Sequence, residues 1–436
     1  MQLKEMREVI KSSQTVSYIG KIDNVIGMTI EATGVKAAIG DINIISTQGG
    51  KKDILSEVVG FKEDRIVLMP YEAPKGLSPG SFVHNTSHHL AIPVGDFLKG
   101  RVIDVMGNPI DSLGDFSVNQ YYSVENEYIN PFQRPPIREQ LDFGIKAIDG
   151  MLTVGKGQRI GIFAGSGVGK STLMGMIARN VTTDINVIAL VGERGREVRE
   201  FLENDLGPEG LARSVVVVAT SDQSAMLRMK CPLVATTIAE YFKDQGKDVL
   251  LMMDSLTRFA MAQREIGLAI GEPPVSRGYT PSIYAELPKL LERSGKFEKG
   301  SITGIYTVLV EGDDTNEPIA DTVRGILDGH IVLSRKLAAR NHFPAIDVSA
   351  SISRLMTLIV PTDHRIAAAK LRDLLSTYEQ NADLIAIGAY KAGTNAKLDK
   401  AIEKIDAINA FLMQDIEAAF DRDYIVNSIV EIVKDV

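Results

Sequence analysis

The chain has 436 residues, of which 44% are hydrophobic and 24% are charged, and its formal net charge is −8. This length predicts two or three domains, and the composition is that of an ordinary globular protein. The acidic balance argues against a general nucleic-acid-binding protein. No stretch approaches the ~18 apolar residues that a membrane span needs. The N-terminus lacks the apolar core of a signal peptide. The single cysteine, Cys231, excludes an internal disulfide and suits a reducing cytoplasm.

Residues 1–16 are predicted to form an amphipathic helix. Leu3, Met6, Val9 and Ile10 fall on one helical face. This face must pack either on the chain's own domain or on a partner's helix, and the pattern leaves both open.

Residues 17–92 are predicted to form a small β-barrel. Short alternating segments are separated by Gly, Asp, Asn and Lys at intervals of roughly 8–12 residues, as in barrels. No catalytic group stands out in them, so we expect a mechanical role such as a collar that holds a ring together.

The segment IGIFAGSGVGKSTLMGMIARN (160–180) has the pattern of a phosphate-binding loop. An apolar strand end is followed by a glycine-rich turn, then by Lys170-Ser171 and a helical run, which is the context that this motif requires. Ala164 takes the place of the first glycine, where a methyl group can be accommodated. The predicted nucleotide-binding residues are Ala164, Gly165, Ser166, Gly167, Val168, Gly169, Lys170, Ser171 and Thr172.

Each residue type in this loop has a physical reason. Glycines let consecutive backbone N–H groups approach phosphate oxygens, and the helix that follows adds the positive end of its dipole. Lys170 supplies a cation for the β- and γ-phosphates, and the Ser171 hydroxyl is a hard oxygen ligand for Mg²⁺.

The remainder of residues 93–355 alternates near-continuous apolar strands with helical stretches. This alternation indicates an α/β domain with a buried, mostly parallel sheet and helices on both faces. The segment 330–340 is expected to continue the sheet. Residues 356–436 read as an α-helical domain, interrupted by the turn-rich joint KAGTNA.

Two acidic residues at strand ends point to hydrolysis of the nucleotide. Asp254 ends the apolar run VLLMMD (249–254), which suits a carboxylate that holds Mg²⁺. Glu193 lies just beyond the strand in VIALVGERG, where it could orient and deprotonate the attacking water.

Phosphoryl transfer also needs a cation against the developing negative charge, often an arginine from a neighbouring subunit. Arg354, in SISR, is one candidate. Spacing alone does not favour it over Arg194, Arg277 or Arg324.

Several longer segments together resemble the catalytic subunits of rotary ATPases. They are FAGSGVGKST, LVGERGREVREF, DSLTRFAMAQREIG, GEPPVSRGYTPSIYAELPKLLERSG and PAIDVSASISR, and the matching segments extend from about residue 20 to 414. Within that family, the segments RFAMAQREIGLAIGEPP and LIAIGAYKAGTNAKLD are most similar to those of the ATPases of flagellar and type III protein export.

The resemblance implies a barrel, a RecA-like nucleotide domain and a C-terminal helical domain. It implies a homohexamer with ATP and Mg²⁺ at the subunit interfaces. The roles that it implies are the catalytic carboxylate for Glu193, an interface position for Arg194, phosphate contact for Lys170, Mg²⁺ for Ser171 and Asp254, a finger acting in trans for Arg354, and adenine stacking for Phe343.

The resemblance also implies partners and a location. A stator-like regulator would bind the N-terminal helix, and a stalk-like protein would sit in the ring centre. The export gate and export substrates or their chaperones would be further partners, with no nucleic acid. The ring would be cytoplasmic and peripherally associated with the inner face of the membrane.

Alternatives remain at this level. The catalytic β-type subunit of a rotary proton-translocating ATP synthase carries a strongly acidic loop where this chain has YKAGTNA with Lys391. A virulence-type secretion ATPase is not separated from a flagellar one. A ring-forming docking platform would not need Glu193, Asp254 and Arg354 together. A hexameric nucleic-acid translocase conflicts with the acidic balance.

Overall fold

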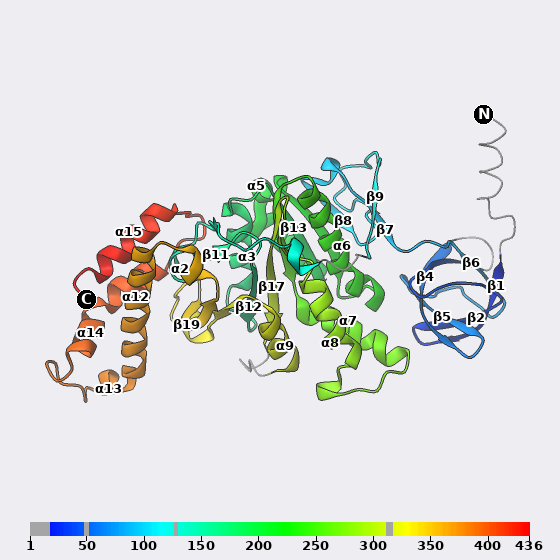
Figure 1. The fold of residues 1–436 in the computed structure, drawn as a ribbon. Helices are drawn as coiled ribbons and strands as arrows, with labels where there is room; N and C mark the ends of the chain where they lie inside the picture. The colour runs from blue at the N-terminus through cyan, green and yellow to red at the C-terminus, as the bar shows by residue number, and fades with distance from the viewer. Residues whose placement is uncertain (1–17, 48–51, 126–129, 311–316) are drawn as a thin grey trace.

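The computed structural model describes residues 18–47, 52–125, 130–310 and 317–436. The chain forms three parts that lie in a row, with the barrel at one end, the sheet domain in the middle and the helical part at the other end (Figure 1). The predicted helix over residues 1–16 lies outside the described residues. Within the described residues, no helix is long and apolar enough to cross a membrane.

The N-terminal part is a closed barrel of antiparallel strands in the order β1–β2–β5–β4–β3–β6. Ile22, Ile66 and Leu68 are among the apolar side chains that fill its interior. The barrel therefore has its own core, as the alternating segments predict. Its strands are β1 (Ile19–Ile26), β2 (Thr29–Thr33), β3 (Ile42–Ser46), β4 (Asp53–Lys62), β5 (Arg65–Pro70) and β6 (Phe82–Asn85).

The middle part is built on one large sheet in the order β19–β18–β12–β17–β15–β13–β14–β8. All neighbours on this path are parallel except β18 and β19, and β16 adds an antiparallel pair to β17. The predicted mostly parallel sheet is confirmed. Its strands are β8 (Arg101–Asp104), β12 (Arg159–Ala164), β13 (Ile185–Glu193), β14 (Ser214–Thr220), β15 (Asp248–Asp254), β16 (Gly295–Lys296), β17 (Ser301–Leu309), β18 (Gly329–Leu333) and β19 (Ile346–Ser353).

Both faces of this sheet are buried, which explains the near-continuous apolar strands. Along β13, Ile188 and Leu190 join the core on the face covered by α3, whereas Val187 and Ala189 join the core on the face covered by α6. The helices of this part are α2 (Lys146–Met151), α3 (Lys170–Asn180), α4 (Gly195–Glu200), α5 (Gly207–Ala212), α6 (Ala225–Asp244), α7 (Leu256–Ala269), α8 (Pro281–Leu291), α9 (Pro318–Ile326) and α10 (Arg335–Ala339).

One expectation about this part is wrong in detail, because the segment 330–340 is not strand throughout. The strand β18 ends at Leu333, and the hydroxyl of Ser334 then accepts the backbone N–H of Leu337 and caps α10. A serine at this position favours a helix start over a longer strand. Two small strand pairs complete the middle part: β7 (Ala91–Pro93) with β9 (Tyr121–Ser123), and β10 (Gln140–Leu141) with β11 (Val154–Gly155).

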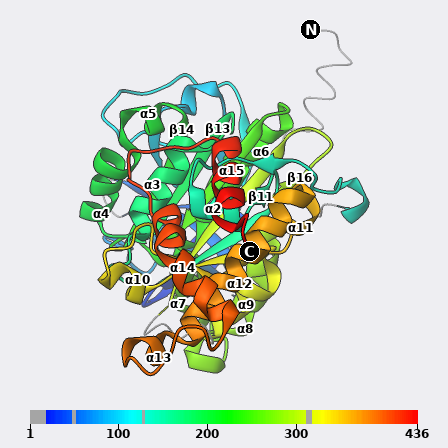
Figure 2. The same cartoon turned by 90° about the vertical axis from the view of Figure 1, so that its left-hand side faces the viewer.

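The C-terminal part is helical and packs on α2, in front of the sheet domain in the view of Figure 2. A Cβ on Gly150 of α2 would lie 2.7 Å from Ile429 Cδ1 and 3.1 Å from Phe411 Cζ, so the helices approach too closely for a larger residue. The helices are α11 (Met356–Ile359), α12 (Thr362–Gln380), α13 (Ala382–Ala386), α14 (Ala396–Leu412) and α15 (Arg422–Val433).

The barrel is joined to the middle part by a buried polar network. Lys230 of α6 lies 2.8 Å from the Glu57 carboxylate of β4, and the Tyr71 hydroxyl donates to the same carboxylate. Ser224 at the start of α6 donates a hydrogen bond of 2.7 Å to the Tyr71 carbonyl. These contacts place charged groups from both parts in one buried cluster.

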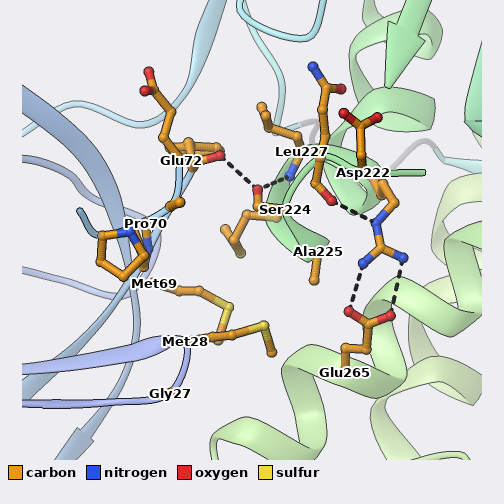
Figure 3. Close-up of a pocket in the computed structure, with 16 residues that line it drawn as sticks. Gly27, Met28, Met69, Pro70, Glu72, Asp222, Ser224, Ala225, Leu227 and Glu265 are labelled. Atoms are coloured by element: carbon orange, nitrogen blue, oxygen red, sulfur yellow. Dashed lines mark hydrogen bonds and ion pairs between the residues drawn. The ribbon is translucent and has the colours of Figure 1, made fainter. Parts of the chain in front are cut away.

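Next to this network lies a cavity of about 530 Å³ between the barrel and α6 (Figure 3). Met28 and Met69 of the barrel side form part of its apolar wall, and an Arg228–Glu265 ion pair of 2.6 Å stands at its edge. The cavity lies on the α6 face of the sheet, whereas α3 covers the opposite face.

Candidate active site

The predicted phosphate loop, residues 164–169, connects β12 in the middle of the sheet to α3. Gly167 and Gly169 have φ angles of +77° and +84°, in the left-handed region that side chains with a Cβ rarely adopt. The loop therefore needs glycine at these two positions for its backbone conformation. Ser166 and Gly167 are exposed, whereas Ala164 and Val168 are buried.

Three charged side chains meet beside this loop. The Lys170 ammonium contacts Asp254 Oδ1 and lies 3.9 Å from Glu193 Oε1. The three side chains are only 13%, 6% and 14% exposed. Burial weakens the screening of their charges by water, so the charges of Asp254 and Lys170 act on the Glu193 carboxyl group.

The sheet register explains why these residues meet. Leu190 of β13 is paired with Asp254 of β15, so Glu193 and Asp254 both lie at the carboxyl edge of the sheet. Thr307 of β17 donates a hydrogen bond of 2.7 Å to Asp254 Oδ1 and fixes its carboxylate. Ligands of parallel α/β sheets bind at this edge.

The pKa of Glu193 is raised to about 7, chiefly because burial disfavours its charged form and secondly because of the nearby Asp254 charge. Glu193 Oε1 is buried without a hydrogen-bond partner among the described residues. A buried polar atom without a partner marks a place for a water, an ion or a substrate. A carboxyl group that titrates near neutral pH is suited to general-base chemistry.

Arg258 is a residue of this cluster that the sequence analysis did not identify. Its Nε is also buried without a partner among the described residues, and its charge lowers the pKa of Glu193 against the larger effect of burial. The side chain lies over Gly192, where a Cβ would be 3.1 Å from Arg258 Cβ. The available signal is its place in the first turn of the helix after Asp254, beside the same sheet edge.

The other predicted nucleotide-binding residues surround the start of α3. Ser171 is exposed, and Thr172 hydrogen-bonds Asp205, whose pKa is raised by burial. Phe343 is 37% exposed, and its ring approaches the loop, since a Cβ on Gly169 would lie 3.5 Å from Phe343 Cε1.

Arg354 lies at the opposite edge of the sheet from the phosphate loop. Its backbone N–H donates to the Asp328 carbonyl, and Asp328 in turn donates to the carbonyl of Arg159, the first residue of β12. The loop follows the last residue of that strand, roughly 16 Å away at about 3.3 Å per residue. Arg354 therefore does not reach the loop of its own chain.

Arg194 directly follows Glu193 in the chain and lies on the surface. It begins α4, its side chain is 79% exposed, and it pairs with Glu197 at 3.2 Å. Both Arg194 and Arg354 are accessible to another molecule.

The oxygen atoms beside the phosphate loop fit a Mg²⁺ ion bound together with a nucleotide. The Ser171 hydroxyl and the Asp254 carboxylate are the oxygen ligands that Mg²⁺ prefers in nucleotide sites. Within the described residues, no cluster of three or more His, Cys, Asp or Glu residues could hold a metal by itself. A Mg²⁺ ion here would be held by a few protein oxygens together with phosphate and water.

Three family models match the chain. The nucleotide-binding domain of the ATP synthase alpha/beta family matches residues 144–353, and the β-barrel domain of the same family matches residues 22–87. The T3SS EscN ATPase C-terminal domain matches residues 360–431.

Curated relatives and solved structures agree with these models. The chain is 56% identical over 415 residues to the flagellum-specific ATP synthase of Bacillus subtilis (strain 168), with 95% of each chain covered. It is 52% identical to the type 3 secretion system ATPase of Xanthomonas euvesicatoria, with 91% of this chain and 89% of that one covered.

The structure of the assembled ATPase EscN from the enteropathogenic E. coli type III secretion system matches with a TM-score of 0.90 at 48% identity. It covers 95% of this chain and 100% of that one. EscN in complex with its central stalk EscO matches with a TM-score of 0.88 at 47% identity. The chain therefore belongs to the ATP synthase alpha/beta family, among its flagellum-specific and type III secretion ATPases.

Proposed function

We propose that the chain hydrolyses Mg²⁺–ATP at a site completed by a second copy of itself, and that this hydrolysis serves flagellar protein export. The observation that carries the proposal is the buried Glu193 carboxyl group, which faces Lys170 and Asp254 beside the phosphate loop. An ordinary structural carboxylate at a strand end would be solvated or fully paired.

In this mechanism Glu193 accepts the proton of a water that attacks the γ-phosphorus, and the bond to the ADP oxygen breaks. When nucleotide binds, the Lys170 ammonium leaves the Asp254 carboxylate and contacts the β- and γ-phosphates. The phosphates then supply the negative charge that Asp254 supplies in the free protein. Mg²⁺, held by Ser171 and Asp254, would neutralise phosphate charge. Arg258 lies close enough to bias Glu193 toward its ionised form.

A second subunit would supply Arg354. In one chain this arginine is exposed at the edge of the sheet opposite the loop, which supports a role at the loop of a neighbour. The assembled state named for EscN supports an oligomer, and we propose a homohexameric ring with Arg194 at the same interface.

The role in export follows from the relatives and from the C-terminal part. The C-terminal model of the secretion ATPases matches residues 360–431, which favours export over the synthase β subunit. The loop there carries Lys391 and is closed by Tyr390, whose hydroxyl donates to Asp399 at 2.8 Å. A stalk-like protein in the ring centre is supported by the EscN–EscO complex.

The remaining partners follow from the family alone. We propose that the ring works in the cytoplasm at the inner face of the membrane, with the export gate and export substrates or chaperones as further partners. A stator-like regulator would bind residues 1–16, which lie outside the described part. A virulence-type secretion system is the alternative setting.

Glu193→Gln tests the chemistry. Gln keeps the shape but cannot accept the proton, so phosphate release should fall by about 10²- to 10⁴-fold while binding of a fluorescent ATP analogue persists. Glu200→Gln, a nearby exposed acid paired with Arg196, is the matched control and should keep its activity.

Two results would contradict the proposal. Unchanged turnover in Glu193→Gln would remove this residue from the mechanism. A wild-type chain that binds nucleotide but releases no phosphate at any protein concentration would favour the docking-platform alternative.

A further inference from the structure

The connection between β18 and β19, residues 334–345, contacts the phosphate loop at both ends. Phe343 approaches Gly169 at the end of the loop, and Arg335 approaches Gly165 at its beginning. A Cβ placed on Gly165 would lie 2.7 Å from Arg335 Nη2, 2.9 Å from Nε and 3.2 Å from Cζ. The guanidinium therefore fills the space that a side chain at position 165 would occupy.

Gly165 differs from the other loop glycines in this respect. Gly167 and Gly169 need glycine for their left-handed backbone, and Gly165 is not among the residues with a positive φ. At Gly165 the space for a side chain is taken by the Arg335 guanidinium, the flexible end of a long side chain, and Gly165 itself is buried beneath it.

Arg335 is held by the start of α10. The backbone N–H of Ser334 donates a hydrogen bond of 2.9 Å to the Ala345 carbonyl, which closes the connection on itself. At the far end, the Phe343 carbonyl accepts a hydrogen bond of 2.9 Å from the backbone N–H of Gln414, in the C-terminal part. The connection is thus anchored on both sides of the loop that it touches.

We propose that Arg335 is a positioning residue for the phosphate loop. Its guanidinium packs against the beginning of the loop at Gly165. The N–H groups of the loop are thereby held in the orientation that binds phosphate even before nucleotide arrives. Pre-positioned donors matter because a misplacement of about 1 Å at a reacting site can cost about 100-fold in rate. This inference rests on the proposed function, since it concerns the same nucleotide.

Arg335→Ala should weaken binding of a fluorescent ATP analogue and raise KM for ATP by about tenfold, with a smaller change in kcat, because the loop loses order in the free enzyme. The KM of Arg335→Lys for ATP should lie between the values of the wild type and Arg335→Ala, since lysine keeps the charge and loses the planar group. Lys336→Ala is the matched control, because Lys336 is the next residue and lines the same cavity of about 220 Å³.

Combining Gly165→Ala with Arg335→Ala distinguishes a steric contact of Arg335 with the loop from an independent effect of its charge. Arg335 lines that cavity, so a methyl group at position 165 can displace the guanidinium into it without distorting the loop. Gly165→Ala should therefore reproduce much of the Arg335→Ala effect, and the double variant should bind nucleotide no more weakly than Arg335→Ala alone.

The inference is overturned if the two effects multiply, if Arg335→Ala leaves both affinity and KM unchanged, or if it lowers only the thermal midpoint. Should Arg335→Ala not fold, Arg335→Lys and Gly165→Ala carry the same comparison. Binding and turnover are measured separately. A wild-type chain without phosphate release would sink the proposed function, whereas unchanged binding in the variants would sink the role of Arg335.

Discussion

Glu193 shows how a single side chain acquires its chemistry from its surroundings. The sequence predicts a position just beyond a strand, and the structure makes Glu193 the last residue of β13. Charged residues where strands end are common, so the position alone is weak evidence. Burial and the nearby Asp254 raise its pKa to about 7. This environment makes the carboxyl group a candidate base near neutral pH.

The raised pKa predicts a pH dependence of the ATPase. The protonated carboxyl group cannot accept the proton of water, so kcat/KM should fall on the acid side with an apparent pKa of about 7. The residual activity of Glu193→Gln should lack this acid limb. An ordinary acid limb near pH 4.5 in the wild type would mean that Glu193 is not the titrating base.

At the scale of elements, α3 depends on a glycine that helix propensity would disfavour. A Cβ on Gly175 would lie 2.4 Å from the Asp205 carbonyl oxygen, which belongs to the π-helical turn Phe201–Leu206. The helix that carries the phosphate loop can therefore pack against this turn only with glycine at this position.

Gly175→Ala should lower the thermal midpoint, because backbone atoms of the turn must move, at a cost of about 1–3 kcal/mol. Gly325→Ala in α9 is the matched control. Among the described residues, no heavy atom beyond its chain neighbours and the backbone of its own helix lies within 4 Å of its Cβ position, so alanine should be neutral or stabilise by up to about 1 kcal/mol. Equal effects of the two substitutions would contradict this account.

The helix α6 links the barrel to the sheet through Lys230. Lys230→Met would leave the Glu57 carboxylate buried without its cation, which typically costs about 3–5 kcal/mol. We expect a lower midpoint of urea unfolding, largely restored by adding Glu57→Gln. Arg199→Ala, which removes an exposed pair, should cost less than about 1 kcal/mol. A Lys230→Met effect as small as that of Arg199→Ala would refute the role of this network.

For the whole molecule, the proposed site draws on residues at the two edges of one sheet. Glu193 lies at the carboxyl edge of the sheet and Arg354 at the opposite edge. In the proposed mechanism, a monomer holds both groups without bringing them together. Specific activity should accordingly rise with protein concentration as subunits associate.

Mixing two inactive variants tests this division. Glu193→Gln and Arg354→Ala should each be inactive alone, yet a mixture should regain activity. In a mixed ring, some interfaces combine Glu193 from an Arg354→Ala subunit with Arg354 from a Glu193→Gln subunit, and both residues are intact at those interfaces. Phosphate release measured across mixing ratios should pass through a maximum. A flat, inactive profile in rings shown to contain both variants would mean that the two residues do not share a site.

Features that depend on local chemistry can be predicted from the order of residues along the chain. The phosphate loop, the acids at the ends of apolar strands and the order of barrel, sheet and helices all follow from residue type and periodicity along the chain. The segment around Ser334 shows where such a prediction fails. Its apolar pattern fits either a strand or a helix, and the Ser334 hydroxyl, which caps α10, favours the helix.

Which of these residues meet depends on how distant segments pack in three dimensions. In the sheet, β15 pairs with β13 although β14 lies between them in the chain, and β17 lies between β15 and β12. This order collects Lys170, Glu193 and Asp254 at one edge. It also sets Arg335 against Gly165 and turns Arg354 away from its own loop. Strand pairing and register depend on contacts between distant segments, and no local pattern of residues encodes them.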